Sequence, residues 1–418
     1  MSMGKTGKNT HLEHLEDSIL LDGADGAAAA FEFIDALVDT FSGTQAAGND
    51  FLITTKWDGS PAVICGVNVD DPQQWFFVGT KSVFNKTDPK IIMTEEDLVR
   101  HHGHQAELAN KLKACLMYFP ELELHKNYKV IQGDLLFTDD GVDAVIDGKT
   151  YFTFTPNTIT YAIPKGTPAY DHAKLAKVGV VFHTRYSGDS IANMSASFGV
   201  DVTKFKSTPN VFVISASVDT VGSKMFLTAA EAKTIQSLLA KSMVLTKTAK
   251  VMLNTFAEQI DAADALTLGP LVKIFYNKLI RDGKSIGNIP TFTKDFLAYF
   301  EETVLKAVEK VSQPKSKAAK LDKLYTGQKF VTSHAAAFAA SVQLYVNIQQ
   351  MKMLFIKKLQ ASDPTRTFLR TPDGFRVTAP EGFVAIRHGT KAMKLVDRLE
   401  FSMANFTIPK NWVKGGTS

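Results

Sequence analysis

Apolar and polar positions change their spacing several times along the chain, and these changes divide it into segments. Residues 9–41 place apolar side chains three or four positions apart around a Gly-rich turn at 22–26, which is typical of amphipathic helices. From 50 to 220, short runs rich in Val, Ile, Phe and Tyr are separated by Gly, Pro and Asp turns, which predicts strands. One helical stretch, 94–118, interrupts these strands.

Helical spacing returns between about 221 and 360, where Thr228 and Glu231 have the spacing of a capping box. After 365 the strand pattern resumes, with a turn expected at Thr371-Pro372-Asp373-Gly374. These patterns predict an α+β fold, in which a domain with a largely antiparallel sheet is interrupted by a helical insertion. The expected segments are an N-terminal helical segment at 1–45, the two parts of the sheet domain at 46–220 and 366–418, and the insertion at 221–365.

Positive charge is concentrated in the expected insertion. Residues 221–360 contain 20 Lys and Arg against 10 Asp and Glu, a balance of +10, so the rest of the chain carries +4 minus +10, or −6. Such an asymmetry favours an anionic partner on the helical segment, and we expect nucleic acid there. Five lysines around a Pro-containing loop are the candidate contacts, with a solvated loop as the alternative: Lys310, Lys315, Lys317, Lys320 and Lys323.

Composition places the chain among globular proteins, since 45% of its residues are hydrophobic and 22% are charged. Cys65 and Cys115 match no zinc spacing, and no apolar run is long enough to span a bilayer. Because the start carries no signal-peptide core, we expect a cytoplasmic protein, in the host cytoplasm if a phage encodes it. The early GKTGK lacks the spacing of a phosphate-binding loop and is expected to be a flexible tail.

Lys56-Trp57-Asp58-Gly59 is the first motif that could carry chemistry. On a strand, Lys56 and Asp58 point to the same face, and Gly59 allows a tight turn. A lysine nucleophile must lose its proton, so it needs apolar surroundings or nearby cations that lower its pKa. Four residues recur by chance, and the alternative is a hairpin with a surface lysine.

Further motifs follow in a fixed order along the chain. They are Thr80-Lys81-Ser82, Gln132-Gly133-Asp134-Leu135-Leu136, Val180-Val181-Phe182-His183-Thr184-Arg185, Glu381-Gly382-Phe383-Val384-Ala385, and the series from Lys391 through Lys394 to Arg398. The ordered set resembles the motifs of the covalent nucleotidyltransferases, and of phage-type ATP-dependent RNA ligases in particular. The chain is also similar to an uncharacterised tailed-phage family with KWDG, GDL and KLVDR elements, which implies no activity.

The resemblance implies an activity and a set of roles. Lys56 would attack ATP and hold AMP as a phosphoramidate, which would then pass to the 5′-phosphate of a polynucleotide, RNA rather than DNA. Mg²⁺ is the expected metal, because phosphate chemistry favours hard ions with oxygen ligands. The other roles are Asp58 and Gly59 as motif partners, Lys81 on nucleotide or nucleic acid, Asp134 on the ribose, Phe182 stacked on the base, Glu381 on the metal, and Lys394 and Lys391 on phosphates.

The sequence departs from the ligase pattern at three places. Asp134 stands where Glu is usual, the interval between Phe182 and Glu381 is long, and Lys391 and Lys394 are spaced K-x-x-K. Only 24 residues follow Lys394, too few for a five-stranded oligonucleotide-binding barrel, which favours the RNA-ligase-like branch over DNA ligases and capping enzymes. The alternatives are an inactive module of the same fold that binds nucleic acid or nucleotide, and a structural phage protein.

Three histidine groups are weaker candidates. His11, Glu13, His14 and Asp17 have metal-compatible helical spacing, although a solvated polar face has the same pattern. His101, His102 and His104 favour a surface helix cap or loop. His183 and Arg185 flank the Phe182 strand position and are candidates for a phosphate contact.

Overall fold

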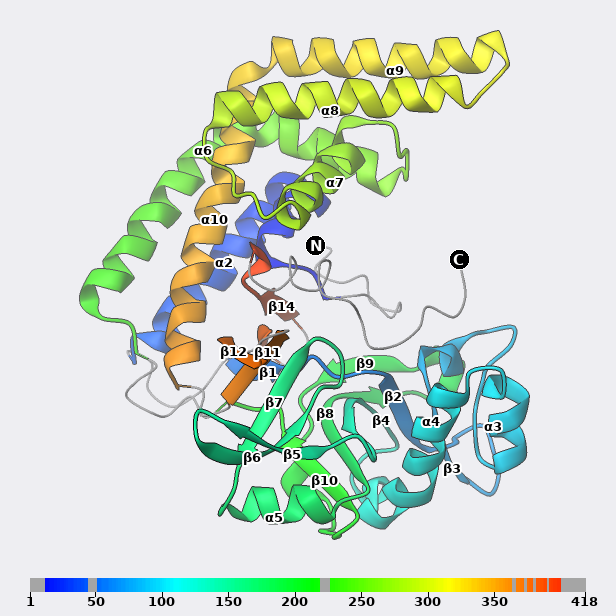
Figure 1. Cartoon of the computed structure of the whole chain (residues 1–418). Coiled ribbons are helices and arrows are strands. Elements are labelled where there is room, and N and C mark those ends of the chain that lie inside the picture. Colours follow the sequence, from blue (N-terminus) through cyan, green and yellow to red (C-terminus); the bar gives the residue numbers. More distant parts are fainter. Residues whose placement is uncertain are drawn as a thin grey trace.

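The computed structural model describes residues 12–43, 51–218, 226–362, 366–371, 374–378, 381–388 and 391–399. Helices form one part of the molecule and most strands form another, with β14 lying between the two parts (Figure 1). Three β-sheets, here called sheets A, B and C, account for the strands of these residues.

Sheet B is the largest and has the strand order β10-β8-β4-β2-β3, with β9 paired to β8. Its strands are β2 (Ala62–Val67), β3 (Phe76–Gly79), β4 (Val130–Phe137), β8 (Val178–Ser187), β9 (Ser195–Phe198) and β10 (Val211–Ser215). One face is covered by α3 (Glu95–His102) and α4 (Ala106–Tyr118), which bury Leu98, Leu112 and Cys115 against it. Neighbouring strands are antiparallel except β8 and β10, which are parallel.

Sheet C is antiparallel and packs with α5 (Pro168–Leu175) on the other face of sheet B. Its strands, in chain order, are β5 (Val142–Ile146), β6 (Lys149–Phe154), β7 (Ile159–Pro164), β11 (Arg366–Thr371) and β12 (Gly374–Thr378). Because β11 pairs with β7, this sheet joins chain segments about 200 residues apart. Between sheets B and C lies an aromatic core that includes Phe137, Phe154 and Tyr161.

Sheet A is small and has the order β1-β13-β14, all antiparallel. Its strands are β1 (Phe51–Lys56), β13 (Gly382–Arg387) and β14 (Lys391–Leu395). Strand alternation gives this sheet two different faces. Phe51, Ile53 and Phe383 point into the largest hydrophobic core of the molecule, which they share with the helices.

The helical part combines the N-terminal helices with those after sheet B. It contains α1 (Ser18–Leu21), α2 (Gly23–Phe41), α6 (Ala229–Asp261), α7 (Leu268–Arg281), α8 (Ile289–Glu309), α9 (Pro314–Ser333) and α10 (Ala335–Ser362). Six short 3₁₀ helices add Leu15–Asp17, Lys81–Phe84, Phe119–Leu122, Leu124–Lys126, Ile191–Asn193 and Val202–Lys204. The capping box predicted at Thr228 and Glu231 is present at the start of α6.

The predicted α+β class, with mainly antiparallel sheets and a long helical region, is confirmed. Two details differ from the expectation. First, the stretch 94–118 forms two helices, because Gly103 and the following residues end α3. Second, the N-terminal helices pack on α6 and do not form a separate unit. The expected turn residues Pro372 and Asp373 lie outside the described residues. Across the described helices, none is both long and apolar enough to cross a membrane.

Candidate functional site

Lys56 and Glu381, 325 positions apart in the sequence, meet at one end of sheet A. Pairing of β1 with β13 places Lys56 directly opposite Gly382, so Glu381 follows immediately at the strand end. The Lys56 Nζ forms an ion pair with Glu381 Oε1. The second carboxylate oxygen of Glu381, Oε2, is buried and has no hydrogen-bond partner among the described residues.

The face of sheet A opposite the helices points toward sheet B. Thr54 and Lys56 stand on this face of β1, and Val384, which pairs with Thr54, stands on it in β13. Lys394 pairs with Val384 in β14 and therefore shares the face. Alternation sends Lys391, with Met393 and Leu395, toward the helical core side, where Lys391 is exposed. The expected phosphate role of Lys391 is therefore corrected, whereas Lys394 lies on the Lys56 side.

Sheet B supplies the opposite wall of a pocket that contains Lys56. Asp134 lies on β4, and His183 on β8 places its Nε2 3.5 Å from Asp134 Oδ2. The pocket encloses about 520 Å³ of empty space, counted with its open mouth. Its lining is mostly apolar with a few polar groups, as in typical small-molecule sites. The lining residues are Leu12, Thr54, Thr55, Lys56, Trp57, Asp134, Val181, His183, Phe198, Ala216, Val384 and Ile386.

Asp58 is a buried structural residue next to Lys56. One carboxylate oxygen accepts a hydrogen bond from Asn157 Nδ2 at 2.7 Å, and the other accepts from the Thr158 and Ile159 backbone N–H groups at 2.7 and 3.0 Å. The Asp58 N–H donates to the Tyr161 hydroxyl at 2.6 Å. Asp58 thus fastens the β6–β7 turn to the segment after β1, next to Lys56.

Gly59 is required for the close approach of this segment to β4. A Cβ atom at Gly59 would lie 2.4 Å from the Asp134 Cβ and 3.0 Å from the Leu135 carbonyl oxygen. The Ser60 N–H donates to that carbonyl at 2.9 Å. Since any larger residue would push β4 away, Gly59 brings Asp134 beside the lysine.

The charge state of Lys56 differs from the sequence-based expectation of a lowered pKa. Burial lowers the pKa of Lys56, but the Glu381 carboxylate, with Asp134 and Asp58, outweighs burial and raises it above the ordinary lysine value. Burial likewise raises the pKa of Glu381, against the opposing effect of the Lys56 ammonium. Lys394 shows the reverse behaviour, because burial and the nearby Lys56 charge lower its pKa. In this state Lys56 is a protonated partner of Glu381.

Phe182 does not line the pocket, which corrects its expected stacking role. Alternation along β8 sends Val181 and His183 to the pocket and Phe182 to the α4 side, where it is fully buried. Its ring makes edge contacts with Phe119 and Phe205. The half-buried aromatic that does line the pocket is Phe198 on β9, beside β8.

Lys81 lies at the same end of sheet B as Asp134 but outside the pocket lining. β3 ends at Gly79, opposite Ile64, and Lys81 then begins an exposed 3₁₀ turn. Arg185 is exposed on β8 beyond His183, and of these two candidates only His183 lines the pocket. No sequence pattern indicates Phe198 or the Asn157 and Tyr161 contacts of Asp58, because each depends on strand pairing across the fold.

A buried polar network lies behind the site and joins three parts of the chain. Lys352 of α10 donates to both carboxylate oxygens of Glu16, at 2.7 and 2.8 Å. Asp17 accepts hydrogen bonds from the Tyr345 hydroxyl and from Arg398, both at 3.1 Å. Glu16 and Asp17 are therefore structural acids, and Arg398 is a structural cation.

The N-terminal metal site, the weaker of the two alternatives for this segment, does not form from the described residues. His11 lies outside them, Asp17 bonds to Arg398, and Glu13 lies 3.8 Å from Lys273. No group of three His, Cys, Asp or Glu positioned to hold a metal ion occurs in the part of the chain that the structure describes. His101, His102 and His104 lie at and after the end of α3, as expected for a helix terminus.

The five candidate nucleic-acid lysines lie on the α8–α9 hairpin, which extends along the outer side of the helical part (Figure 1). Lys310, Lys315 and Lys317 are exposed and Lys320 is half-buried. Lys323 differs, because it forms an ion pair with Asp264 at 2.7 Å. Its expected contact with nucleic acid is therefore replaced by a structural pairing.

Comparison with known proteins gives a family but no described activity. No curated protein and no solved structure matches the chain. One family matches residues 9–410, a span that includes both ends of sheet A and the whole helical part. The chain therefore belongs to this family, described as a family of unknown function (DUF6267).

Proposed function

We propose that the protein is an ATP-dependent nucleotidyltransferase of the polynucleotide-ligase type, which acts through a lysyl-AMP intermediate on Lys56. The observation that carries the proposal is the convergence of Glu381, Asp134 and Lys394, from separate chain segments, around Lys56, which lines the pocket together with Asp134. Packing alone does not require this set, because apolar residues would fill the same space at lower desolvation cost.

In the proposed first step, the neutral Lys56 amine attacks the α-phosphorus of ATP. An N–P bond forms, the bond between the α-phosphorus and its bridging oxygen to the β-phosphate breaks, and pyrophosphate leaves with that electron pair. The ammonium proton must leave first, to water or to the Glu381 carboxylate, so that the amine lone pair is free to attack. In later steps, AMP passes to a 5′-phosphate and a 3′-hydroxyl displaces it. Lys394 would offset phosphate charge, which is the main contribution a protein makes in phosphoryl transfer.

Glu381 fits the proposed role of a Mg²⁺ ligand in one respect. Its Oε2 is a buried carboxylate oxygen without a partner among the described residues, and Mg²⁺ prefers oxygen ligands. Since no group of three potential protein ligands forms a metal site among the described residues, the nucleotide phosphates would provide most of the remaining ligands. Bound Mg²⁺ would neutralise phosphate charge.

RNA is the proposed polynucleotide, with the α8–α9 hairpin as its contact. Exposed Lys310, Lys315 and Lys317 can release counterions from phosphates, which makes affinity fall steeply with salt. Replacing these three by Ala should weaken RNA binding and reduce its salt dependence. Lys323→Ala is the contrast, since Lys323 already pairs with Asp264. Equal RNA affinity in the triple variant and the wild type would exclude the hairpin.

The test of the catalytic proposal is incubation with α-labelled ATP and Mg²⁺, followed by denaturing electrophoresis. Wild-type protein should carry label, and Lys56→Arg should not, because a guanidinium stays protonated and cannot attack phosphorus. Folding of the variant is checked by circular dichroism. If the folded wild-type protein carries no label, and none when Mn²⁺ replaces Mg²⁺ or when GTP or NAD⁺ replaces ATP, the result would support an inactive module of the same fold. The observation that favours this second candidate is the Lys56–Glu381 ion pair.

A further inference from the structure

A short N-terminal stretch extends sheet A along the free edge of β14. The Lys394 N–H donates to the Glu13 carbonyl at 3.0 Å, and His14 pairs with Lys394 in a parallel bridge. Paired residues on adjacent strands stand on the same face of a sheet. His14 therefore shares the face of Lys394, the face on which Leu12 lines the pocket.

His14 and Lys394 are both left without side-chain partners in the described structure. The His14 Nδ1 atom is buried and makes no hydrogen bond to any described residue. No ion pair found among the described residues includes the Lys394 ammonium, whereas the neighbouring Lys352 and Arg398 are matched by Glu16 and Asp17. A buried polar atom such as the His14 Nδ1 normally has a partner, so this atom and the half-buried Lys394 beside it are suited to a ligand that the chain itself does not supply.

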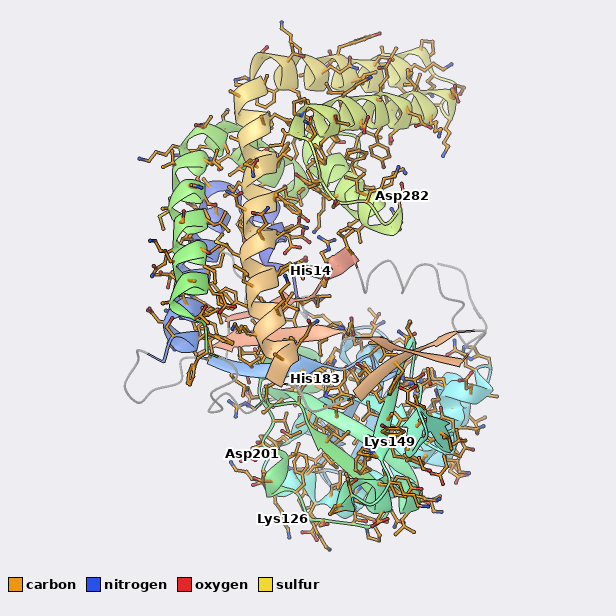
Figure 2. All side chains as sticks on the ribbon, turned by 60° about the vertical axis from the view of Figure 1, so that its left-hand side comes forward. His14, Lys126, Lys149, His183, Asp201 and Asp282 are labelled. Atoms are coloured by element: carbon orange, nitrogen blue, oxygen red, sulfur yellow. The ribbon has the colours of Figure 1, made fainter. Side chains whose placement is uncertain are left out.

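The polar groups of the site form an ordered series from sheet B to the edge of sheet A. Asp134 and His183 lie at one end, Lys56 is in β1, and Lys394 and His14 lie two and three strands further on. In Figure 2, His14 lies between the helices and the sheets, and His183 lies lower, at the upper edge of the sheet part. Neighbouring strands are about 4.8 Å apart, so long lysine side chains can span the interval.

We propose that His14 and Lys394 bind the β- and γ-phosphates of the nucleoside triphosphate and retain them as pyrophosphate when it leaves. The inference rests on the proposed function. With the nucleoside beside sheet B and the α-phosphate at Lys56, the remaining phosphates extend toward β14. The leaving pyrophosphate then departs on the side away from the attacking Lys56 amine, as in-line displacement requires.

Electrostatics support a polyanion at this place. Burial lowers the pKa of His14 well below its usual value, and four surrounding cations lower it further: Lys352, Arg398, Lys394 and Lys56. The ring is therefore neutral and carries one N–H, which can donate to a phosphate oxygen. Three of these cations have ion-pair partners, since Glu381 pairs with Lys56, Glu16 with Lys352 and Asp17 with Arg398. Lys394 has no such partner among the described residues, and a phosphate oxygen would supply its counter-charge.

The test is calorimetric titration with inorganic pyrophosphate and, separately, with AMP, in the presence of EDTA. His14→Asn should weaken pyrophosphate binding about 10- to 100-fold, the effect of losing a hydrogen bond to a charged group, and should leave AMP binding unchanged. His104→Asn is the matched control, because His104 is exposed after α3. Competition titrations of the wild-type protein are a second measurement. Pyrophosphate should displace ATP, but it should bind at the same time as AMP.

Three results would overturn the assignment: no pyrophosphate binding by wild-type protein, unchanged pyrophosphate affinity in a folded His14→Asn variant, or equal losses for pyrophosphate and AMP. If thermal unfolding shows that His14→Asn is not folded, His14→Gln replaces it and the competition experiment decides. Failure of the proposed function is distinguishable, because it would appear as absence of the Lys56 adduct while pyrophosphate still binds through His14.

Discussion

At the scale of single residues, the ion pair of Lys56 with Glu381 determines how the proposed nucleophile is activated. Glu381 raises the Lys56 pKa above its ordinary value, so at neutral pH nearly all molecules carry the ammonium. Because the neutral fraction grows with pH up to the pKa, the rate of self-adenylation at saturating ATP and Mg²⁺ should rise about tenfold per pH unit between about pH 7 and pH 9. The test is to measure the rate of AMP labelling across this pH range. A rate that does not change with pH would show that proton loss from Lys56 does not limit the step.

The same pair contributes to stability. Lys56→Met leaves the Glu381 carboxylate buried without its cation, which should cost about 1–3 kcal/mol near neutral pH. Adding Glu381→Gln should recover part of the loss.

The pH dependence of this effect has a defined sign. The folded-state pKa of Glu381 is raised, so its protonated form is the one the fold prefers, and the cost of deprotonation increases as pH rises through that pKa. The loss in Lys56→Met should therefore be smaller near pH 5 than near pH 8. Urea unfolding of the wild type and the variant at both pH values measures the loss in unfolding free energy. Equal losses at the two pH values would argue against a charged, buried Glu381.

At the scale of elements, the contact between the segment after β1 and β4 depends on the absence of a side chain at Gly59. Gly59→Ala would place a methyl group 2.4 Å from the Asp134 Cβ, so β4 or the segment must shift. We expect a loss of about 1–3 kcal/mol, typical of overpacking, together with loss of adenylation. Gly287→Ala is the control, since nothing lies within 4 Å of its added Cβ. Equal unfolding midpoints for the two variants would contradict the close approach.

Strand alternation explains which site residues could be predicted from the sequence and which could not. The pattern around Phe182 and around Lys391 correctly indicated strands, but alternation fixes only that neighbours point to opposite faces. Which face carries the pocket depends on the helices that cover the other one, and α4 and the helical core cover the Phe182 and Lys391 sides. Motif order did bring Lys56 and Glu381 together, because the β1–β13 register follows from their flanking strands.

At the scale of the whole molecule, the buried Glu16–Lys352 pair ties the N-terminal segment to α10. Lys352→Met would leave Glu16 charged and fully buried, with only the 3.8 Å ion pair to Arg398, and breaking a buried pair costs about 3–5 kcal/mol. The double variant Glu16→Gln, Lys352→Met should recover most of the loss.

Chemical denaturation of the single and double variants measures this coupling. The exposed pair Lys306–Glu302 on α8 is the matched control, and Lys306→Met should give no measurable change. If the Lys352→Met variant were as stable as the wild type, Glu16 would have taken up a proton or found another partner at no cost.

Pairing of β1 with β13 also has a consequence for the order in which the chain folds during synthesis. Residues 51–56 leave the ribosome more than 300 residues before 382–387, so β1 must wait for β13, whereas its bridge from Thr54 to Ser217 can form earlier. Sheet B consists of nearer contacts and can form earlier, since contacts distant in sequence are slow to close. The Lys56–Glu381 end of sheet A is therefore completed late, and a premature stop before residue 382 would remove β13 together with the side chains that β13 and β14 add to the largest core.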